Sequence, residues 1–238
     1  MSFEVRRYAR TELLVAEAAR EWLELIRQHP TQGRPHLVAL GGGRVFLDFL
    51  LAAADDFRTQ AISLRRVEFF WGDERCVPPD HPESNYRLAR EALLGPLGVG
   101  AGQIRRLRGE VDPIEAARAA EVVLRVAAGV GTTGQPVLDL VFLGLGEDGH
   151  VASLFPNAPA EVTESQAVYL PVIGPKPPPQ RLTLSYASIA AARQVWVIAS
   201  GNGKEEALRE SLRLGGSTPL ARVLRDRANT SIFTDIPC

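Results

Sequence analysis

The sequence of 238 residues has little cysteine and no long uncharged apolar run. Its two cysteines, Cys76 and Cys238, lie far apart and form no C-x-x-C pair, which argues against a disulfide framework or a cysteine-ligated metal. Charges interrupt every apolar stretch before it reaches membrane-spanning length, and no apolar segment follows the arginines of residues 1–10. We therefore expect a cytoplasmic protein with no membrane partner.

An excess of charge of either sign is also absent. Lysine and arginine together number 27 and aspartate and glutamate 28, so the overall field gives no reason to expect a nucleic-acid partner. An anionic ligand would have to be bound by local groups instead. Metal-ligand spacing such as H-E-x-x-H is missing as well, and we expect a monomer that needs no metal and no cofactor.

What the sequence does contain is a regular alternation of helical and strand patterns. Helices are expected at 11–28, 45–54, 84–94, 113–128, 204–214 and 219–226, and strands at 36–40, 67–71, 137–143, 195–199 and 230–234. Residues 171–179 are rich in proline and are expected to form a surface segment. The alternation predicts a single domain, 1–238, with a three-layer α/β/α Rossmann-like fold and a mostly parallel sheet.

Three loops that directly follow predicted strands are rich in glycine or charge. They lie at 41–44, 72–75 and 144–150. Ligands of open α/β sheets bind beyond the carboxyl ends of the strands. We therefore expect these loops to lie near one another at one edge of the sheet.

The loop at 144–150 contains the pattern Gly-x-Gly-x-x-Gly, which also occurs in dinucleotide-binding proteins. Such a site needs a long helix directly after the loop to hold the pyrophosphate at its N-terminus. Pro156 follows soon after, and residues 151–159 are expected to form a short turn and loop. The pattern therefore does not favour a nicotinamide-binding oxidoreductase.

The segment Asp148-Gly149-His150 is the more informative part of this loop. An imidazole has an unperturbed pKa of about 6.5, which suits a general base near neutral pH. A histidine beside a carboxylate, on a glycine-hinged turn after a core strand, is a candidate base, and the alternative is a histidine that only caps the loop. His29 and His36 have simpler explanations, at the end of a helix and the start of a strand.

Candidate anion ligands occur in the other loops. Gly42 and Gly43 allow backbone N–H groups to converge on an anion and Arg44 adds a charge, although a tight strand-to-helix turn without a ligand explains the same residues. Arg75 has a bidentate side chain suited to phosphate, and Asp73 would bind sugar hydroxyls or orient Arg75. Taken singly, such charges are more simply explained as solvated surface groups. The remaining candidates of this kind are Arg181 and Lys204.

Together these segments resemble those of the 6-phosphogluconolactonase family. The most specific of them is Asp148-Gly149-His150-x-Ala152-Ser153-Leu154-Phe155-Pro156. The others are Asp73-Glu74-Arg75-x-Val77-Pro78, Ser84-Asn85-Tyr86, Arg181-x-Thr183-Leu184 and Gly201-x-x-Lys204. The resemblance spans nearly the whole chain.

The resemblance implies a Rossmann-like fold shared with glucosamine-6-phosphate deaminases. It also implies hydrolysis of a sugar-phosphate lactone, 6-phospho-D-glucono-1,5-lactone, to 6-phospho-D-gluconate in the oxidative pentose phosphate pathway. By the same resemblance His150 is the catalytic base and Asp148 its neighbour in the site. The implied ligands of the substrate or its phosphate are Arg75, Asn85, Arg181 and Lys204.

One loop departs from the family pattern, which usually reads Gly-Gly-Ser/Thr-x-Pro. Here Gly42-Gly43-Arg44-Val45 lacks both the hydroxyl and the proline, so hydroxyl contacts to a phosphate are lost and Arg44 is the candidate replacement. Two alternatives remain. In amino-sugar phosphate deaminases the segment after the histidine usually reads I-A-F-N-E-P, with an acidic residue that 151–156 lacks. A non-catalytic sugar-phosphate sensor would keep the anion ligands without needing His150.

Overall fold

The computed structural model describes residues 2–30 and 32–237. Six strands form a central sheet in the order β1-β9-β8-β5-β2-β3, and all neighbouring pairs are parallel. Their bounds are β1 Ser2–Arg7, β2 His36–Leu40, β3 Val67–Trp71, β5 Leu140–Gly144, β8 Gln194–Ala199 and β9 Ala228–Thr234. The expected α/β class with a mostly parallel sheet is confirmed.

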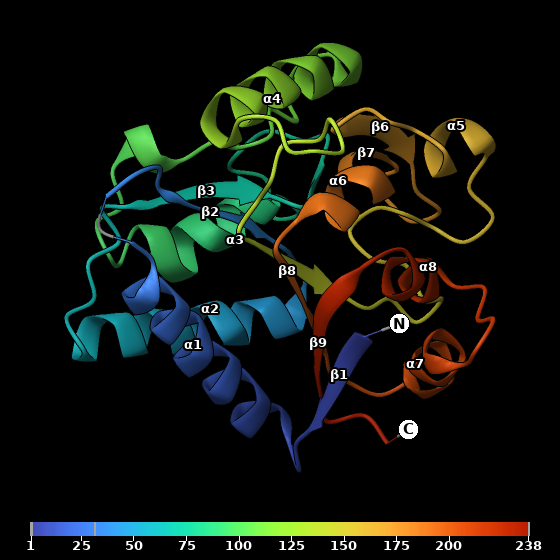
Figure 1. Ribbon diagram of the computed structural model, residues 1–238, viewed down its shortest axis with the longest axis horizontal. Helices are drawn as coiled ribbons and strands as arrows, with labels where there is room; N and C mark the ends of the chain where they lie inside the picture. The colour runs from blue at the N-terminus through green and yellow to red at the C-terminus, as the bar shows by residue number, and fades with distance from the viewer. Residues whose placement is uncertain (1, 31, 238) are drawn as a thin grey trace.

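Helices cover both faces of this sheet (Figure 1). One face carries α1 Thr11–Gln28 and α2 Arg44–Thr59, and the other carries α4 Pro113–Ala128, α6 Tyr186–Ala191, α7 Glu205–Leu212 and α8 Pro219–Asp226. The chain crosses the sheet outward from β1 through β2 to β3 and returns through β5 and β8 to β9. Right-handed crossovers place the helices of the outward and return paths on opposite faces, which gives the three layers.

A second, antiparallel sheet of three strands was not predicted. It consists of β4 Asp73–Arg75, β7 Gln180–Leu184 and β6 Tyr169–Ile173, in the order β4-β7-β6. The sequence predicted a loop at 72–75 and a proline-rich surface segment at 171–179. Asp73 pairs with Thr183, more than a hundred residues away, and such pairing leaves no local pattern. Pro171 is accommodated because β6 is an edge strand.

Several element bounds also differ from those expected. The strand expected at 137–143 is β5 at 140–144, the helix expected at 45–54 is α2 at 44–59, and the helix expected at 204–214 is α7 at 205–212. The helix expected at 84–94 divides into α3 Asn85–Ala89 and a π-helical turn, Arg90–Leu94. Strand β1 was missed because it is an edge strand in which Glu4 and Arg6 interrupt the apolar pattern. A short 3-10 helix spans Ala101–Gln103.

The core is built from strands that are apolar on both faces and from aromatic side chains of α1 and α2. All five residues of β2 are buried, as expected of a central parallel strand. The ring of Phe142 in β5 lies 5.2 Å from that of Trp22 in α1 and 4.8 Å from that of Phe49 in α2. These rings hold one helical layer against the middle of the sheet. Helix α4 is capped at its start, because the Asp112 side chain accepts from the N–H groups of Ile114 and Glu115.

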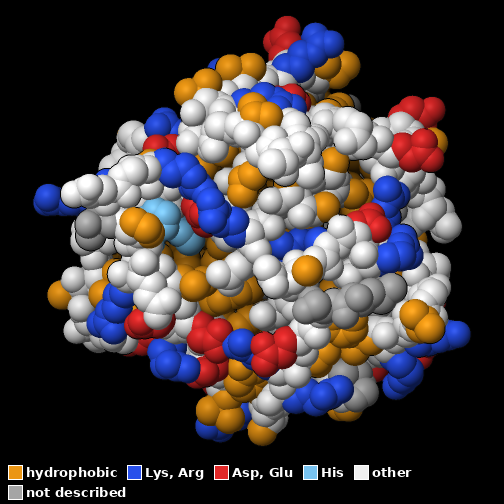
Figure 2. All heavy atoms as spheres, viewed as in Figure 1, with side chains coloured by type: hydrophobic (Ala, Val, Ile, Leu, Met, Phe, Trp, Pro, Cys, Tyr) orange, Lys and Arg blue, Asp and Glu red, His pale blue; other side chains and the backbone are white. Residues whose placement is uncertain are grey.

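Charges of both signs are interspersed over the face of the molecule seen in Figure 2, with apolar side chains among them. This agrees with the nearly balanced composition, 27 basic against 28 acidic residues. None of the described helices is both long enough and apolar enough to cross a bilayer.

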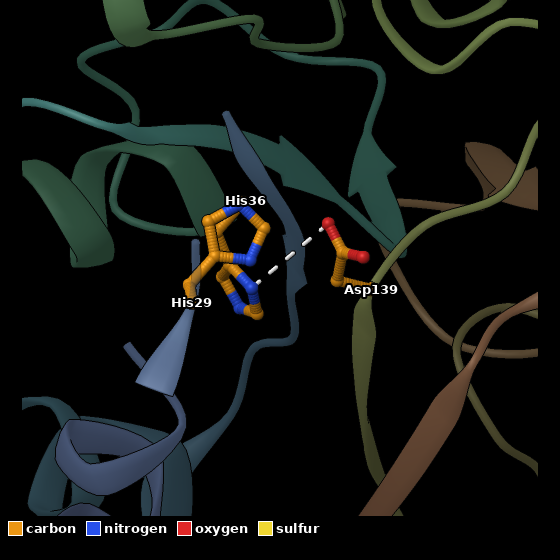
Figure 3. A group of neighbouring side chains, drawn as sticks. All are labelled: His29, His36 and Asp139. Atoms are coloured by element: carbon orange, nitrogen blue, oxygen red, sulfur yellow. Dashed lines mark ion pairs between the residues drawn. The ribbon is translucent and has the colours of Figure 1, made fainter. Parts of the chain in front are cut away.

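At the amino-terminal ends of the strands, Asp139 is the centre of a polar cluster with His36 and His29 (Figure 3). The guanidinium of Arg34 donates two hydrogen bonds to the Asp139 carboxylate, at 2.6 and 2.7 Å, and the backbone N–H of Leu37 donates a third at 2.9 Å. The cluster therefore ties the end of α1 to the start of β2 and to the residue before β5.

Candidate ligand atoms of His29, His36 and Asp139 lie within 4.8 Å of one another, which raises the question of a metal ion. Both oxygens of Asp139 are already occupied by Arg34, and Arg193 adds an ion pair at 3.2 Å. Two arginines around one carboxylate leave a local positive charge that disfavours a divalent cation. We interpret the cluster as structural.

The buried imidazole of His36 makes the fold sensitive to acid. Burial lowers its pKa from 6.5 to about 4, so in the folded protein the ring stays neutral where the unfolded chain binds a proton. Stability should therefore fall as the pH drops from about 6.5 to about 4, by up to roughly 3 kcal/mol. We expect His36→Asn to flatten the dependence of the melting temperature on pH in this window. His81→Asn, in the turn before α3, serves as the control, and an unchanged slope in His36→Asn would contradict the assignment.

Candidate active site

The loops expected to meet at one edge of the sheet do meet there. The chain leaves the sheet in opposite directions from β2 and β5, and ligands of doubly wound sheets bind at such a switch point. The carboxyl ends of β2, β3, β5 and β8 surround a pocket of about 680 Å³. Among the sequence candidates, the pocket is lined by Gly42, Gly43, Arg44, Asp73, Arg75, Asn85, His150, Arg181 and Lys204.

Asp148 does not line the pocket but reaches it through His150. Its carboxylate Oδ1 lies 2.5 Å from His150 Nδ1 and also accepts the backbone N–H of His150 at 3.2 Å. With Nδ1–H donating to the carboxylate, Nε2 of the imidazole is left as an acceptor. Burial raises the pKa of Asp148, but the hydrogen bond and charge of His150 outweigh it and leave that pKa below its usual value.

Two glycines allow the loop to hold the imidazole in this position. A Cβ on Gly146 would lie 2.0 Å from His150 Nδ1, so the ring rests directly on the backbone of the loop. Gly149 has a φ of +82°, which favours glycine, and a Cβ there would also strike Thr218. The two glycines thus allow the backbone of the loop to lie directly against neighbouring side chains.

The chain after Gly149 is unlike that of a dinucleotide site. Residues Val151 to Leu154 form a turn closed by an isolated bridge, and the next helix, α5 Ala160–Thr163, is a single turn. The long helix needed to bind a pyrophosphate at its N-terminus is therefore not formed at this loop. This agrees with the expectation of a short turn and loop at 151–159.

Asp73 is buried in a hydrogen-bond network on the wall of the pocket. The Asn85 amide donates to Asp73 Oδ1 at 3.1 Å, and the Ser153 hydroxyl donates to Oδ2 at 2.7 Å. Gly42 lies close against this network, since a Cβ there would be 1.9 Å from Asn85 Oδ1. The sequence suggested that Asp73 either binds sugar hydroxyls or orients Arg75. The second role is not seen, since Arg75 pairs with Glu83 at 3.0 Å.

Glu74 organises the same wall and was missed as a site residue. Its buried carboxylate accepts four hydrogen bonds, from the N–H groups of Arg75, Asn85 and Tyr86 and from the hydroxyl of Ser84. Burial raises its pKa although these donors oppose the shift. The signal in the sequence was the pair of acids Asp73-Glu74 shortly after the strand at 67–71, with Ser84 as the N-cap of the next helix.

Five cations line the pocket. Lys176 is exposed and lies 4.0 Å from Glu147, and the other four form two pairs. Arg181 and Arg75 are close enough that the charge of Arg75, together with burial, lowers the pKa of Arg181. Arg181 also donates to the carbonyls of Pro178 and Lys176. Lys204 and Arg44 form the second pair, because burial lowers the pKa of Lys204 and Arg44 contributes in the same direction. Within residues 2–30 and 32–237, neither Arg44 nor Lys204 has a side-chain hydrogen bond or ion pair.

A cluster of two hydroxyl groups and a carboxylate near Lys204 was also not identified from the sequence. The side chains of Thr11 and Ser200 line the pocket, and both donate to Asp235 Oδ2, at 2.6 and 2.9 Å. The carboxylate of Asp235 counteracts the lowering of the pKa of Lys204. These three residues follow β1, β8 and β9, and nothing in the local sequence indicates that they meet.

Comparison with known proteins agrees with this geometry. The model of the family described as glucosamine-6-phosphate isomerases/6-phosphogluconolactonase matches residues 9–232. The chain belongs to this family. A 6-phosphogluconolactonase of Mycobacterium tuberculosis is 35% identical over 231 residues, which cover 93% of this chain and 90% of the relative. One of Streptomyces coelicolor is 36% identical over 236 residues, 95% and 90% of the two chains.

Solved structures of the family share the fold. The 6-phosphogluconolactonase of Trypanosoma brucei superposes with a TM-score of 0.85 at 31% identity, covering 97% of this chain and 95% of that one. A monomeric glucosamine-6-phosphate deaminase superposes with a TM-score of 0.81 at 17% identity, which shows a common fold alone. Both enzyme types of the family name are thus built on this architecture.

The role of Glu74 can be measured through stability. In Glu74→Gln an amide N–H₂ would face donors that now bind a carboxylate oxygen, so we expect the free energy of unfolding to fall by roughly 1–3 kcal/mol. Glu83→Gln is the matched control, because Glu83 is half exposed and pairs with Arg75 alone, and should cost less than about 1 kcal/mol. Chemical denaturation gives both values, and equal losses would refute the assignment.

Proposed function

We propose that this protein hydrolyses 6-phospho-D-glucono-1,5-lactone to 6-phospho-D-gluconate, with His150 as the general base. The observation that carries the proposal is the pairing of His150 with Asp148 on the wall of a pocket that also holds two unpaired cations, Arg44 and Lys204. A base and an anion anchor in one pocket fit a substrate that has an ester at one end and a phosphate at the other. The family relationship supports the same reaction.

The base acts through Nε2, the nitrogen left free by the Asp148 hydrogen bond. A water oxygen attacks the lactone carbonyl carbon while Nε2 takes the water proton. The tetrahedral intermediate then collapses with cleavage of the bond between that carbon and the ring oxygen. The imidazolium returns the proton to the ring oxygen, which leaves as a hydroxyl group, and the carboxylic acid ionises in water.

The phosphate is anchored by Lys204, Arg44 and the first turn of α2. The first N–H groups of a helix have no intrahelical acceptor and carry the positive end of its dipole. Gly42 and Gly43 bring this backbone to the pocket without a side chain in the way. Arg75 and Arg181 are engaged by Glu83 and by backbone carbonyls, so they are less available as primary ligands.

The remaining polar wall suits the sugar part of the substrate. Asp73 and Asn85 line the pocket and are held in place by Ser153 and by each other. Carboxylate and amide oxygens are acceptors for sugar hydroxyls. Arg75 and Arg181 on the same side provide positive charge near the oxyanion that forms at the carbonyl.

The reaction is tested by proton release from freshly generated 6-phosphoglucono-δ-lactone, beside unphosphorylated gluconolactone. We expect acceleration of the phosphorylated compound, and His150→Asn should lower kcat by about 10²- to 10⁴-fold without a change in melting temperature. Asp148→Asn should also lower kcat, because it removes the acceptor that fixes the tautomer. Full activity of His150→Asn would disprove the base assignment, and ammonia release from glucosamine 6-phosphate would favour the deaminase instead.

The phosphate anchor predicts a separate pattern of kinetics. Lys204→Met and Arg44→Ser should each raise KM for the phosphorylated lactone, by roughly tenfold or more, because each removes a charge-assisted contact to the dianion. Any turnover of the unphosphorylated lactone should be unaffected. Lys176→Met is the control, since Lys176 is an exposed residue at the rim that pairs weakly with Glu147. Equal effects on both substrates would place the phosphate elsewhere.

A further inference from the structure

Phe155 contacts both the proposed base and one of the pocket arginines. Its ring centroid lies 4.8 Å from that of His150, with the two planes tilted by 44°. The guanidinium carbon of Arg181 lies 5.5 Å from the same ring centroid. No other aromatic contact of His150 is found among the described residues. One side chain therefore joins a residue of the 144–150 loop to a residue of β7.

The same ring lines a second cavity that shares Arg181 with the pocket. His150 and Arg181 line the pocket of about 680 Å³, whereas Phe155, Asp148 and Arg181 line a mainly apolar groove of about 1000 Å³. The ring and the carboxylate that contact His150 thus both line the groove rather than the pocket.

Gly174 packs closely against the ring of Phe155. A Cβ on Gly174 would lie 2.9 Å from Phe155 Cε2 and 3.0 Å from Arg181 Nε, both closer than ordinary van der Waals contact. The backbone at Gly174 is itself held, since its N–H donates to the carbonyl of Pro179 at 2.7 Å. The ring therefore has no room to move toward Gly174.

We propose that Phe155 is a positioning residue that fixes the His150 imidazole against Asp148 and sets its separation from Arg181. The inference rests on the proposed lactone hydrolysis, since it assigns a role toward that base. The hydrogen bond that His150 Nδ1 donates to Asp148 and the backbone of Gly146 hold one edge of the imidazole, and rotation about that hydrogen bond is the freedom that remains. Packing against an aromatic ring of defined tilt removes that freedom.

The first test is Phe155→Leu, which keeps an apolar side chain but removes the ring. We expect kcat for the phosphorylated lactone to fall roughly tenfold to a hundredfold, because a base displaced by about 1 Å loses that much. KM should change little, since the phosphate anchor lies at Lys204 and Arg44. Phe57→Leu is the control, a fully buried ring packed on Trp22. It should lower the melting temperature without lowering kcat.

The second test changes Gly174, which packs against the ring of Phe155. Gly174→Ala places a methyl group against the ring and should lower kcat by displacing it from its present contact with His150. Combined with Phe155→Leu, the methyl group meets a smaller, more flexible side chain. The loss in the double variant should therefore be smaller than the product of the two single losses. Strictly multiplicative losses would show that Gly174 and Phe155 act separately and would overturn the proposal.

A readout independent of turnover separates this inference from the proposed reaction. The proton between His150 Nδ1 and Asp148 can be followed by nuclear magnetic resonance, with a sharper signal expected in the wild type than in Phe155→Leu. A wild-type protein without lactonase activity would refute the reaction, and the proton signal would still test the positioning. Unchanged kcat and an unchanged proton signal in Phe155→Leu would overturn the role of Phe155.

Discussion

The reversal of the chain path between β2 and β5 is the constraint on which the rest of the site depends. From β2 the chain continues outward to β3, and from β5 it returns through β8, so the loops after β2 and β5 diverge and leave a pocket between them. The start of α2 opens on one side of that pocket and the His150 turn on the other. The proposed base and the proposed phosphate anchor thus lie where they could act on two ends of one small molecule, as hydrolysis of a phosphorylated lactone requires.

The shape of the pocket depends on positions at which the backbone lies directly against a side chain. Gly146 lies against the His150 ring and Gly42 against the Asn85 amide, and neither position has room for a Cβ. The buried carboxylates of Asp73 and Glu74 are held by hydrogen bonds to the same wall, while Lys204 and Arg44 are left without partners within the described residues. The wall is thus fixed internally, and the free positive charge is directed toward a ligand.

The fold class followed from the sequence because each central strand is a short apolar block and the helices between them carry regular apolar faces. The small sheet did not, because β4 pairs with a strand more than a hundred residues away and β6 contains a proline. The loops that carry Arg75 and His150 were predicted to meet at one edge of the sheet, whereas Lys204 was identified singly and its place in the same pocket follows from the topology. Glu74, Phe155 and Asp235 were not identified as site residues, because their roles depend on contacts between distant segments of the chain. Periodicity and spacing do not reveal such contacts.

The most direct test of this account is a crystal structure of the protein with the product, 6-phosphogluconate. The account predicts that the phosphate lies at the first turn of α2 between Arg44 and Lys204, and that the new carboxylate lies within hydrogen-bond distance of His150 Nε2. The polyol chain would then cross the wall formed by Asp73 and Asn85. A phosphate bound at Arg75 and Arg181, with the carboxylate away from His150, would contradict the assignment of both the anchor and the base.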